Sequence, residues 1–431
     1  MTRPVAIDIT RVFTSLVRPT PRGIDRVEIG YARELLQSWP AECVAVLPTP
    51  WGIRFFDRQR SLRVLDLADA IWREARPPDA SSSHSALDAW LAGRGEKPAR
   101  RDRASPQWSH GARAAVALVG DVGVRLGKPV ARALPRDSLY VNVGQLVLAA
   151  APLLRWLGRR PDVLPIFMLH DVIPLEFPEY VKPVVHRFHA KMMVHTARYA
   201  AGLITTTQAA AGAVTRELQA RGRPQIPTAV IPLPISAGFL TPETSDAAAS
   251  GVPEGRYFVC LGAIEPRKNH LLLLHVWRDL VRRQGAAAPK LVIVGSRWRD
   301  TDLVVAMLER CPALRDHVCE VSGLPTPALR RLLRGARGLL MPSFAEGFGM
   351  PIIEGLATGT PVIASDLDAH KEAGGDLATY LSPLDGPGWQ TAIEALADAP
   401  ANSEVRAQLA RYTPWLWRDY LARLTPFLES F

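Results

Sequence analysis

The chain has 431 residues, 48% of them apolar, and a formal net charge of +10. This length exceeds what one compact core holds and suits two α/β domains, and the apolar fraction excludes wholesale disorder. Four cysteines without a C-x-x-C pair exclude a disulfide framework and fit a reducing cytosol.

The positive charge points to an anionic partner, which is a nucleic acid, an anionic membrane surface or a phosphorylated ligand. The basic residues are scattered, and neither an RNA-binding motif nor zinc-finger spacing occurs. We therefore expect no nucleic-acid partner. A membrane surface that carries a lipid-linked substrate suits the charge better.

The N-terminal half opens on a strand at residues 5–9, without the charged and apolar regions of a signal peptide, so we expect none. The most apolar long stretch, residues 139–154, is interrupted by Asn142, Gln145 and Pro152. It is also shorter than the roughly 20 residues that cross a bilayer, so we predict no transmembrane helix.

Residues 5 to about 75 read as strands alternating with helices, as in a parallel sheet. The composition changes over about residues 76–135, where prolines, serines and a basic cluster indicate a loop or insertion. Within it, residues 112–126 have an amphipathic pattern. They form either a membrane-docking helix or part of a solvated insertion, and we favour the second.

Regular alternation continues towards the C-terminus. Apolar runs at residues 163–169, 202–205 and 229–233 predict buried parallel strands, and residues 234–253 predict an interdomain linker. The predicted strands and helices that follow are residues 257–261, 271–283, 290–294, 301–311, 318–321, 327–336, 338–341, 350–358 and 361–364. This series predicts a doubly wound sheet, in which ligands bind at the carboxyl ends of the strands.

The first chemical motif is Gly262-Ala263-Ile264-Glu265-Pro266-Arg267-Lys268-Asn269, which joins a strand to a helix. Arg267 suits bidentate contact with phosphate oxygens, and Lys268 adds a compact second charge. Cations are disfavoured at a helix N-terminus by its dipole, and a bound anion removes that penalty. We therefore interpret the pair as a diphosphate site rather than as two solvated surface cations.

The second motif, residues 341–354, follows a strand and opens a helix. Gly347 and Gly349 let the backbone approach a ligand closely, and the helix N-terminus offers free N–H groups to phosphate. Because carboxylates repel a diphosphate, we expect Glu346 to accept hydrogen bonds from a sugar and Glu354 from a ribose.

Residues 255–375 resemble the retaining glycosyltransferases of the GT-B fold, glycosyltransferase family four. The resemblance rests on the Arg267-Lys268 motif, on the Glu346-x7-Glu354 pair and on Gly359-Thr360-Pro361-Val362-Ile363-Ala364-Ser365, and it extends more weakly to the N-terminal half. It implies an α/β protein whose two Rossmann-like, doubly wound domains face each other across a cleft.

The resemblance also assigns roles along the chain. Residues 1–238, with the insertion at about 76–135, bind the acceptor; residues 239–410 bind the nucleotide-sugar donor; residues 411–431 are a helix that packs back across the domains. The implied donor-binding residues are Gly262, Arg267, Lys268, Gly295, Ser296, Val321, Leu324, Glu346, Gly347, Phe348, Gly349, Met350, Pro351, Ile352 and Glu354. In this set Gly295-Ser296 and Val321 to Leu324 lie by the nucleobase.

The sequence Leu169-His170-Asp171-Val172-Ile173-Pro174 follows an apolar strand and resembles the His-Asp-x-x-Pro element of mannosyltransferase-like members. The resemblance places His170 near the reacting sugar carbon, as a catalytic residue together with Arg267, Lys268 and Glu346. Asp171 either contacts the acceptor or orients the loop.

Residues 18–26 follow the first strand and resemble the acceptor-side glycine loop of the family. Gly23 then allows close approach of the acceptor. Arg22 or Arg26 meets an acceptor phosphate, unless these arginines are simply solvated.

Two patterns that suggest metals are weighed and rejected. Asp366-Leu367-Asp368 spells D-x-D, but it lies in a loop where the related proteins carry no metal. Cys311, His317 and Cys319 lack zinc spacing and a fourth ligand. We therefore expect no metal and no cofactor, with the nucleotide sugar as a substrate.

The resemblance implies a retaining hexosyltransferase that moves mannose from GDP-mannose to a lipid-linked oligosaccharide in bacterial capsule, exopolysaccharide or O-antigen synthesis. UDP-glucose or another UDP-hexose is the alternative donor, and a non-catalytic sugar-nucleotide-binding module is the alternative class. A phosphorylase is disfavoured because we identify no pyridoxal-phosphate lysine. The expected location is cytoplasmic, in peripheral contact with the anionic inner face of the cell membrane.

Overall fold

The structure is a computed structural model in which the chain forms two compact units. Residues 2–18, 21, 23–74, 80–99, 116, 120, 127–223, 225–240, 255–298, 300–400 and 404–431 are described. The predicted helix 112–126 therefore lies outside them, apart from two isolated positions. The first unit comprises Met1–Pro77, Ala104–Leu233 and Trp417–Phe431, and the second comprises Pro78–Arg103 and Pro234–Leu416.

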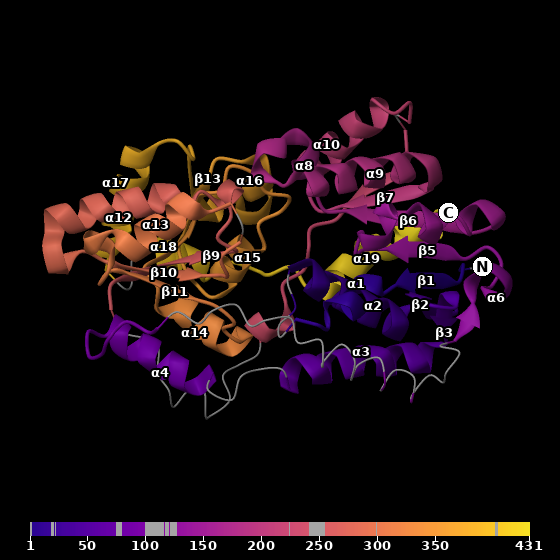
Figure 1. The fold of residues 1–431 in the computed structure, drawn as a ribbon, viewed down its shortest axis with the longest axis horizontal. Helices are drawn as coiled ribbons and strands as arrows, with labels where there is room; N and C mark the ends of the chain where they lie inside the picture. The colour runs from indigo at the N-terminus through magenta and orange to yellow at the C-terminus, as the bar shows by residue number, and fades with distance from the viewer. Residues whose placement is uncertain are drawn as a thin grey trace. The chain divides into compact units, whose positions relative to one another are not determined.

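An eight-stranded sheet in the order β4-β3-β2-β1-β5-β6-β7-β8 forms the centre of the first unit (Figure 1). Its strands are β1 (Val5–Asp8), β2 (Cys43–Thr49), β3 (Gly52–Phe56), β4 (Lys128–Pro129), β5 (Leu139–Asn142), β6 (Leu164–Leu169), β7 (Gly202–Thr205) and β8 (Thr228–Val230). Its α-helices are α1 (Thr10–Ser15), α2 (Gly23–Ser38), α3 (Arg58–Glu74), α6 (Val130–Ala133), α7 (Ala151–Leu154), α8 (Ile173–Glu176), α9 (Pro183–Tyr199), α10 (Gln208–Gln219) and α19 (Trp417–Glu429). Short 3-10 helices are η1 (Leu146–Ala149), η2 (Leu157–Arg159) and η3 (Pro178–Tyr180).

The strands of this sheet run in parallel, except that β3 is antiparallel to β2 and β4. The prediction of parallel strands over residues 5–75 is therefore wrong at β3. Thr49 pairs with Gly52, so only two residues join β2 to β3, which is too short for the crossover that a parallel neighbour needs.

The second unit contains a six-stranded, wholly parallel sheet in the order β11-β10-β9-β12-β13-β14. Its strands are β9 (Tyr257–Leu261), β10 (Lys290–Val294), β11 (Val318–Val321), β12 (Gly338–Met341), β13 (Val362–Ser365) and β14 (Ala378–Leu381). Its α-helices are α4 (Ala80–Leu91), α12 (His270–Gln284), α13 (Asp302–Arg310), α14 (Thr326–Gly335), α15 (Met350–Ala357), α16 (Asp368–Gly374), α17 (Gly386–Asp398) and α18 (Glu404–Leu409). Short 3-10 helices are η4 (Ala237–Phe239), η5 (Pro266–Lys268), η6 (Gly285–Ala287), η7 (Pro312–Leu314) and η8 (Gly375–Leu377).

Both sheets are doubly wound, as predicted, and the predicted series from 257 to 364 agrees with the observed element boundaries to within one residue. The central strands are buried along their whole length, because helices cover both faces of a parallel sheet. They consequently read as continuous apolar runs. Among the described residues, no helix is long and apolar enough to cross a membrane.

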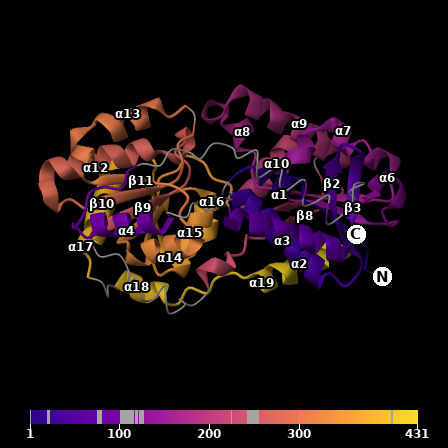
Figure 2. The same cartoon turned by 60° about the horizontal axis from the view of Figure 1, so that its bottom comes forward.

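Two helices pack far from their neighbours in sequence. In the second unit α4 lies beside α14 (Figure 1), where Asp88 pairs with Arg331 at 3.0 Å. In the first unit α19 lies beside α2 (Figure 2), where the Tyr420 hydroxyl donates to the Tyr31 hydroxyl at 3.0 Å. The predicted 76–135 insertion is thus divided between the units, and the C-terminal helix belongs to the first unit.

Candidate functional site

The strand order of the second unit reverses between β9 and β12. The chain runs from β9 to β10 and β11 on one side, and from β12 to β13 and β14 on the other, while β9 and β12 pair in parallel. Loops that leave such a switch point diverge, which is why open α/β sheets bind ligands there. The Arg267-Lys268 motif follows β9 and residues 342–349 follow β12, so both predicted motifs lie at this point.

Arg267 and Lys268 contact the loop after β12 directly. The Arg267 guanidinium donates from Nη1 to the Ala345 carbonyl oxygen and to Glu346 Oε2, both at 2.8 Å. Lys268 Nζ donates to Glu346 Oε1, and the Phe344 N–H donates to the Arg267 carbonyl oxygen at 2.7 Å. The structure therefore brings the paired cations next to the glycine loop, and their role towards a diphosphate stays a prediction.

Glu346 pairs with both cations, and Glu265 Oε1 also lies 2.8 Å from Arg267 Nη2. The Glu346 side chain is only 8% exposed, and Ser343 Oγ also donates to its Oε1, at 2.9 Å. Burial raises the pKa of Glu346, but the charges of Arg267 and Lys268 outweigh burial and hold the pKa below its usual range. The structure therefore pairs this carboxylate with the same two cations that we predicted for a diphosphate.

Glycines let the loops after β9 and β10 pack closely. Gly262 has a φ of +141°, in the region that favours glycine, and lies against the Lys268 side chain. A Cβ at residue 295 would lie 1.8 Å from the Gly262 carbonyl oxygen, so only glycine fits there. Of the residues predicted to lie by the nucleobase, Gly295 and Ser296 follow β10, which pairs with β9. Val321 is the last residue of β11, on the far side of β10, and Leu324 follows it.

Helix α15 begins directly after residues 347–349. Gly349 has a φ of +110° and precedes the first turn, which contains Met350 and Pro351. The start of a helix presents N–H groups and a positive dipole end, which suit phosphate. Phe348 and Ile352 are buried beneath the loop. Glu354 is 2% exposed, as its apolar neighbours indicated, and its role towards a ribose stays a prediction.

His370 in α16 lies against the same loop, although we did not predict it. The ring is fully buried, and its Nδ1 lies 3.0 Å from the Ser365 carbonyl oxygen. A carbonyl only accepts, so Nδ1 carries the proton and Nε2 of the neutral ring is an acceptor. Nε2 has no hydrogen-bond partner among the described residues. Burial lowers the pKa of His370, and a Cβ at Gly349 would lie 3.3 Å from the ring.

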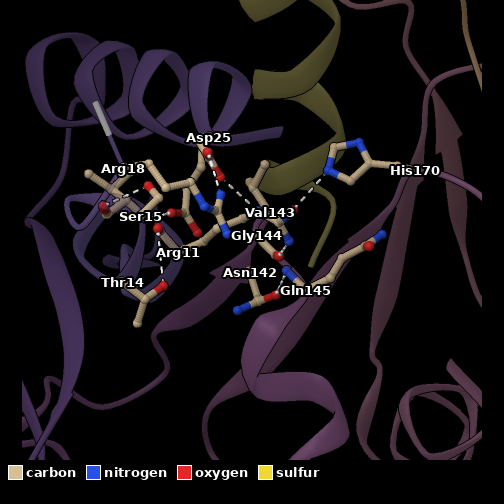
Figure 3. A network of polar contacts seen from close by, with 12 residues as sticks. Arg11, Thr14, Ser15, Arg18, Asp25, Asn142, Val143, Gly144, Gln145 and His170 are labelled. Atoms are coloured by element: carbon tan, nitrogen blue, oxygen red, sulfur yellow. Dashed lines mark hydrogen bonds and ion pairs between the residues drawn. The ribbon is translucent and has the colours of Figure 1, made fainter. Parts of the chain in front are cut away.

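His170 in the first unit follows β6. Its Nε2 lies 3.0 Å from the Val143 carbonyl oxygen (Figure 3), so Nε2 carries the proton and Nδ1 is the acceptor. Burial lowers the pKa of His170 to about 4, and the ring is therefore neutral near pH 7. Asp171 Oδ1 accepts from the Ile173 N–H at 3.1 Å, which orients the loop; its role towards an acceptor stays a prediction.

The predicted acceptor loop is described in part. Arg22 lies outside the described residues, Gly23 begins α2, and Arg26 lies in its first turn. Among the described residues, none has an atom within 4 Å of a Cβ built at Gly23. The predicted catalytic residues divide between the units, with His170 in the first and Arg267, Lys268 and Glu346 in the second.

Two doubly wound α/β units, the second with paired cations beside a glycine loop and a helix N-terminus, are those of the GT-B fold, and the chain has this fold. Residues 255–399 match the family described as "Glycosyl transferases group 1".

Two curated relatives are mannosyltransferases by name. The O-antigen chain mannosyltransferase RfbU of Salmonella typhimurium strain LT2 is 28% identical over 251 residues, which cover 57% of this chain and 64% of RfbU. The serotype-specific mannosyltransferase WbdA of Escherichia coli is 26% identical over 263 residues, which cover 58% of this chain and 32% of WbdA. The chain thus spans less than two thirds of either relative.

A solved structure of Anabaena Alr3699/HepE in complex with UDP and glucose has a TM-score of 0.59 at 16% identity, with all of both chains covered. The α,α-trehalose 6-phosphate synthase of Burkholderia multivorans has a TM-score of 0.54 at 14% identity, covering all of this chain and 95% of that one. At these identities the likeness is one of fold.

Proposed function

We propose that the chain is a retaining hexosyltransferase that moves mannose from GDP-mannose to a lipid-linked oligosaccharide in cell-surface polysaccharide synthesis. One observation carries the proposal: Arg267 and Lys268 meet the loop that opens α15. A nucleoside diphosphate is the leaving group of such a transfer, and two cations beside a helix N-terminus suit its charge. The names of RfbU and WbdA support mannose as the sugar.

In the proposed reaction the bond between the sugar C1 and the diphosphate oxygen breaks, and the acceptor hydroxyl oxygen bonds to C1 on the same face. The hydroxyl proton passes to a phosphate oxygen of the donor. Negative charge grows on the departing diphosphate, and Arg267, Lys268 and the start of α15 stabilise it without reorganising. His170 is neutral near pH 7, so it contributes an acceptor nitrogen to the sugar rather than a proton.

Glu346 changes partners in this scheme. In the free protein it pairs with Arg267 and Lys268. Diphosphate oxygens replace it at these cations, and the released carboxylate then accepts hydrogen bonds from the donor-sugar hydroxyls. Glu354, buried in α15, holds the ribose.

We propose that the same cations, and no divalent metal, neutralise the diphosphate. Arg267 and Lys268 together supply the two positive charges that a divalent ion would bring. Transfer that persists undiminished in excess EDTA supports this proposal, whereas transfer that EDTA abolishes and Mg²⁺ or Mn²⁺ restores refutes it.

A UDP-hexose is the second candidate donor. It is favoured by the likeness of fold to Alr3699/HepE, which was solved with UDP and glucose. Both donors contain a diphosphate, so the Arg267-Lys268 site suits either of them. Recognition of the nucleobase, guanine or uracil, then distinguishes the two donors.

We further propose that the protein lies in the cytoplasm and contacts the anionic inner face of the membrane peripherally. Helix α9 supports this proposal because one exposed stripe carries Val184, Arg187, Lys191, Val194 and Arg198, and its sequence contains no acidic residue. Basic side chains interspersed with exposed apolar ones suit anionic lipid headgroups. Flotation with phosphatidylglycerol vesicles, compared between the native protein and Arg187→Glu with Lys191→Glu, tests it: equal flotation of the two refutes it.

The experiment that tests the enzymatic proposal has two stages. Thermal unfolding with GDP, UDP and ADP identifies the base, because a ligand at 100 times its Kd stabilises the folded state by about 2.7 kcal/mol. Radiolabelled transfer from GDP-mannose or UDP-glucose to lipid-linked oligosaccharide then separates an enzyme from a binding module. Nucleotide binding without any transfer refutes the enzyme, and stabilisation by UDP alone replaces GDP-mannose with the alternative donor.

A further inference from the structure

The first unit has a switch point of its own, between β1 and β5. The chain leaves β1 for β2 on one side, whereas β5 leads to β6, β7 and β8 on the other. Arg11 in α1 follows β1, Gly144 and Gln145 follow β5, and His170 follows β6. Because these strands are parallel, all four residues lie at one edge of the sheet, which is where a ligand of this unit is expected.

Asp25 holds two arginines at this edge. Arg11 Nε donates to Asp25 Oδ1 at 3.0 Å, and Arg18 Nη1 donates to Asp25 Oδ2 at 3.1 Å (Figure 3). The Asp25 side chain is fully buried, whereas those of Arg11 and Arg18 are 24% and 37% exposed. A buried carboxylate requires such pairing, and here it holds two arginine side chains that stay partly exposed.

The loop after β5 is shaped around Arg11. A Cβ at residue 144 would lie 2.7 Å from the Arg11 Cβ and 2.0 Å from Glu28 Oε1, so glycine alone lets Arg11 Nη1 donate to the Gly144 carbonyl oxygen, at 2.9 Å. Gln145 next to it is a buried, non-glycine residue with a φ of +64°. Backbone in this region is strained and is characteristic of ligand sites.

The three paired groups have more positive than negative charge, because the guanidinium groups of Arg11 and Arg18 share the single Asp25 carboxylate. Burial raises the pKa of the nearby carboxyls Glu28 and Asp8. A guanidinium has five N–H donors, of which the described contacts of Arg11 use those on Nε and Nη1. The remaining donors suit an oxyanion.

We propose that Arg11 and Arg18, positioned by Asp25, form an oxyanion site that binds a phosphate or diphosphate group of the acceptor. This inference rests on the proposed transferase function and deepens it. The sequence suggested Arg22 or Arg26 as the residue that binds the acceptor phosphate. The present proposal assigns this role to Arg11 and Arg18 at the switch point instead. The ligand is either a lipid-linked phosphate or a free phosphate, and both present a phosphoryl dianion to the two arginines.

The test uses the full chain with the donor site removed by Arg267→Ala, Lys268→Ala and Glu346→Gln, so that anion binding reports on the first unit. Inorganic pyrophosphate and farnesyl diphosphate are titrated calorimetrically. Adding Arg11→Gln, Arg18→Gln and Asp25→Asn weakens binding of the acceptor-type anion at least about 10-fold, as expected for losing two charge-assisted contacts. The Asp25 change avoids leaving a buried, unpaired carboxylate. Arg155→Gln with Arg159→Gln, two exposed arginines of the same unit, is the matched control.

Every outcome bears on the proposal. Arginine-dependent binding that is tighter for farnesyl diphosphate assigns the site to a lipid-linked acceptor, and equal binding of both probes assigns it to a free phosphate. Binding that is absent, or that falls equally in the control pair, overturns the site. Failure here leaves GDP or UDP stabilisation of the native chain unaffected, whereas failure of the proposed function appears as lost nucleotide binding or lost transfer.

Discussion

The Arg267 guanidinium lies 2.8 Å from the Glu346 carboxylate, although 79 positions separate the two residues in the chain. The contact forms because β9 and β12, which precede the two residues, are adjacent parallel strands at the point where the sheet reverses its order. A buried acid placed between two cations keeps both cations at the site while no anionic ligand is bound. The same arrangement makes the site sensitive to changes of charge.

Removing both cations should disable transfer. We expect Arg267→Ala with Lys268→Ala to lower turnover by at least about 10²-fold, because fixed charges no longer stabilise the departing diphosphate. The measurement is kcat with the donor that binds. Arg282→Ala with Arg283→Ala, an exposed basic pair at the other end of α12, should keep turnover within about two-fold of the native value.

That double variant also leaves Glu346 buried without a counterion, which destabilises folding. Adding Glu346→Gln removes the stranded charge. If this triple variant is folded by circular dichroism and still turns over at a near-native rate, the diphosphate assignment is wrong.

Neutralising Glu346 alone should separate nucleotide binding from transfer. We expect Glu346→Gln to keep or tighten the Kd for the free nucleoside diphosphate, because the internal counterion of Arg267 and Lys268 is gone, and to lower transfer because the sugar loses an acceptor carboxylate. Calorimetry with GDP or UDP and single-turnover assays measure the two effects. A collapse of nucleotide affinity in parallel with transfer would contradict the exchange of partners proposed for Glu346.

Gly295 should tolerate no side chain. Gly295→Ala places a Cβ 1.8 Å from the Gly262 carbonyl oxygen, and because backbone cannot yield as a side chain does, we expect a loss of at least about 2 kcal/mol in the free energy of unfolding. Urea denaturation measures it. Gly386→Ala, where the nearest atom belongs to Leu272 at 3.9 Å, should change stability by less than about 0.5 kcal/mol. Equal stability of the two variants would mean that the loops do not pack as described.

His270 at the start of α12 should make the protein acid-sensitive. Its ring is buried, neither nitrogen has a partner among the described residues, and burial lowers its pKa to about 3. Between about pH 6.5 and pH 3 the unfolded chain binds a proton at His270 that the folded chain does not. Stability therefore falls as the pH drops below about 6.5.

His270→Leu should remove this part of the pH dependence and raise stability at pH 7, because a buried polar group without a partner is replaced by an apolar one. Urea unfolding at several pH values between 4 and 7.5 measures both effects. His275→Leu, at an exposed position of the same helix, serves as the control. A pH profile of the His270 variant that parallels the native one would show that the ring is not buried as a neutral group.

The second unit was largely readable from the sequence. Its strands are short apolar runs that end in Gly262, Gly295 and Gly323, and its helices carry a clear apolar period. The first unit was less readable. The β2–β3 turn, Pro50-Trp51, interrupts the alternation without an obvious glycine-rich signal, so the antiparallel strand was missed. Helices α4 and α14 are joined by an ion pair between Asp88 and Arg331, which lie more than 200 positions apart in the chain. No local sequence pattern specifies such a contact.

The candidate site residues also fall into two groups, those that the sequence could name and those that it could not. Arg267, Lys268, Glu346 and Glu354 could be named as candidates from the sequence, because their types and spacing within one loop or helix are themselves informative. Arg11, Arg18 and His370 were not, because an arginine in or just after a short helix, or a histidine within a helix, is common and has no distinguishing neighbours in the sequence. Their surroundings are created by Asp25, Gly144 and Gly349, which come from other elements.

The sequence by itself determined which segments become strands and helices, where the glycine loops fall, and that the second half carries a diphosphate-type motif, because these depend on residues near one another in the chain. Only the tertiary structure decided that Glu346 pairs with both Arg267 and Lys268, and that Asp25 pairs with both Arg11 and Arg18. Charge pairing and burial act through space over a few ångströms. Which strands lie side by side in the sheet decides which charges come within that distance.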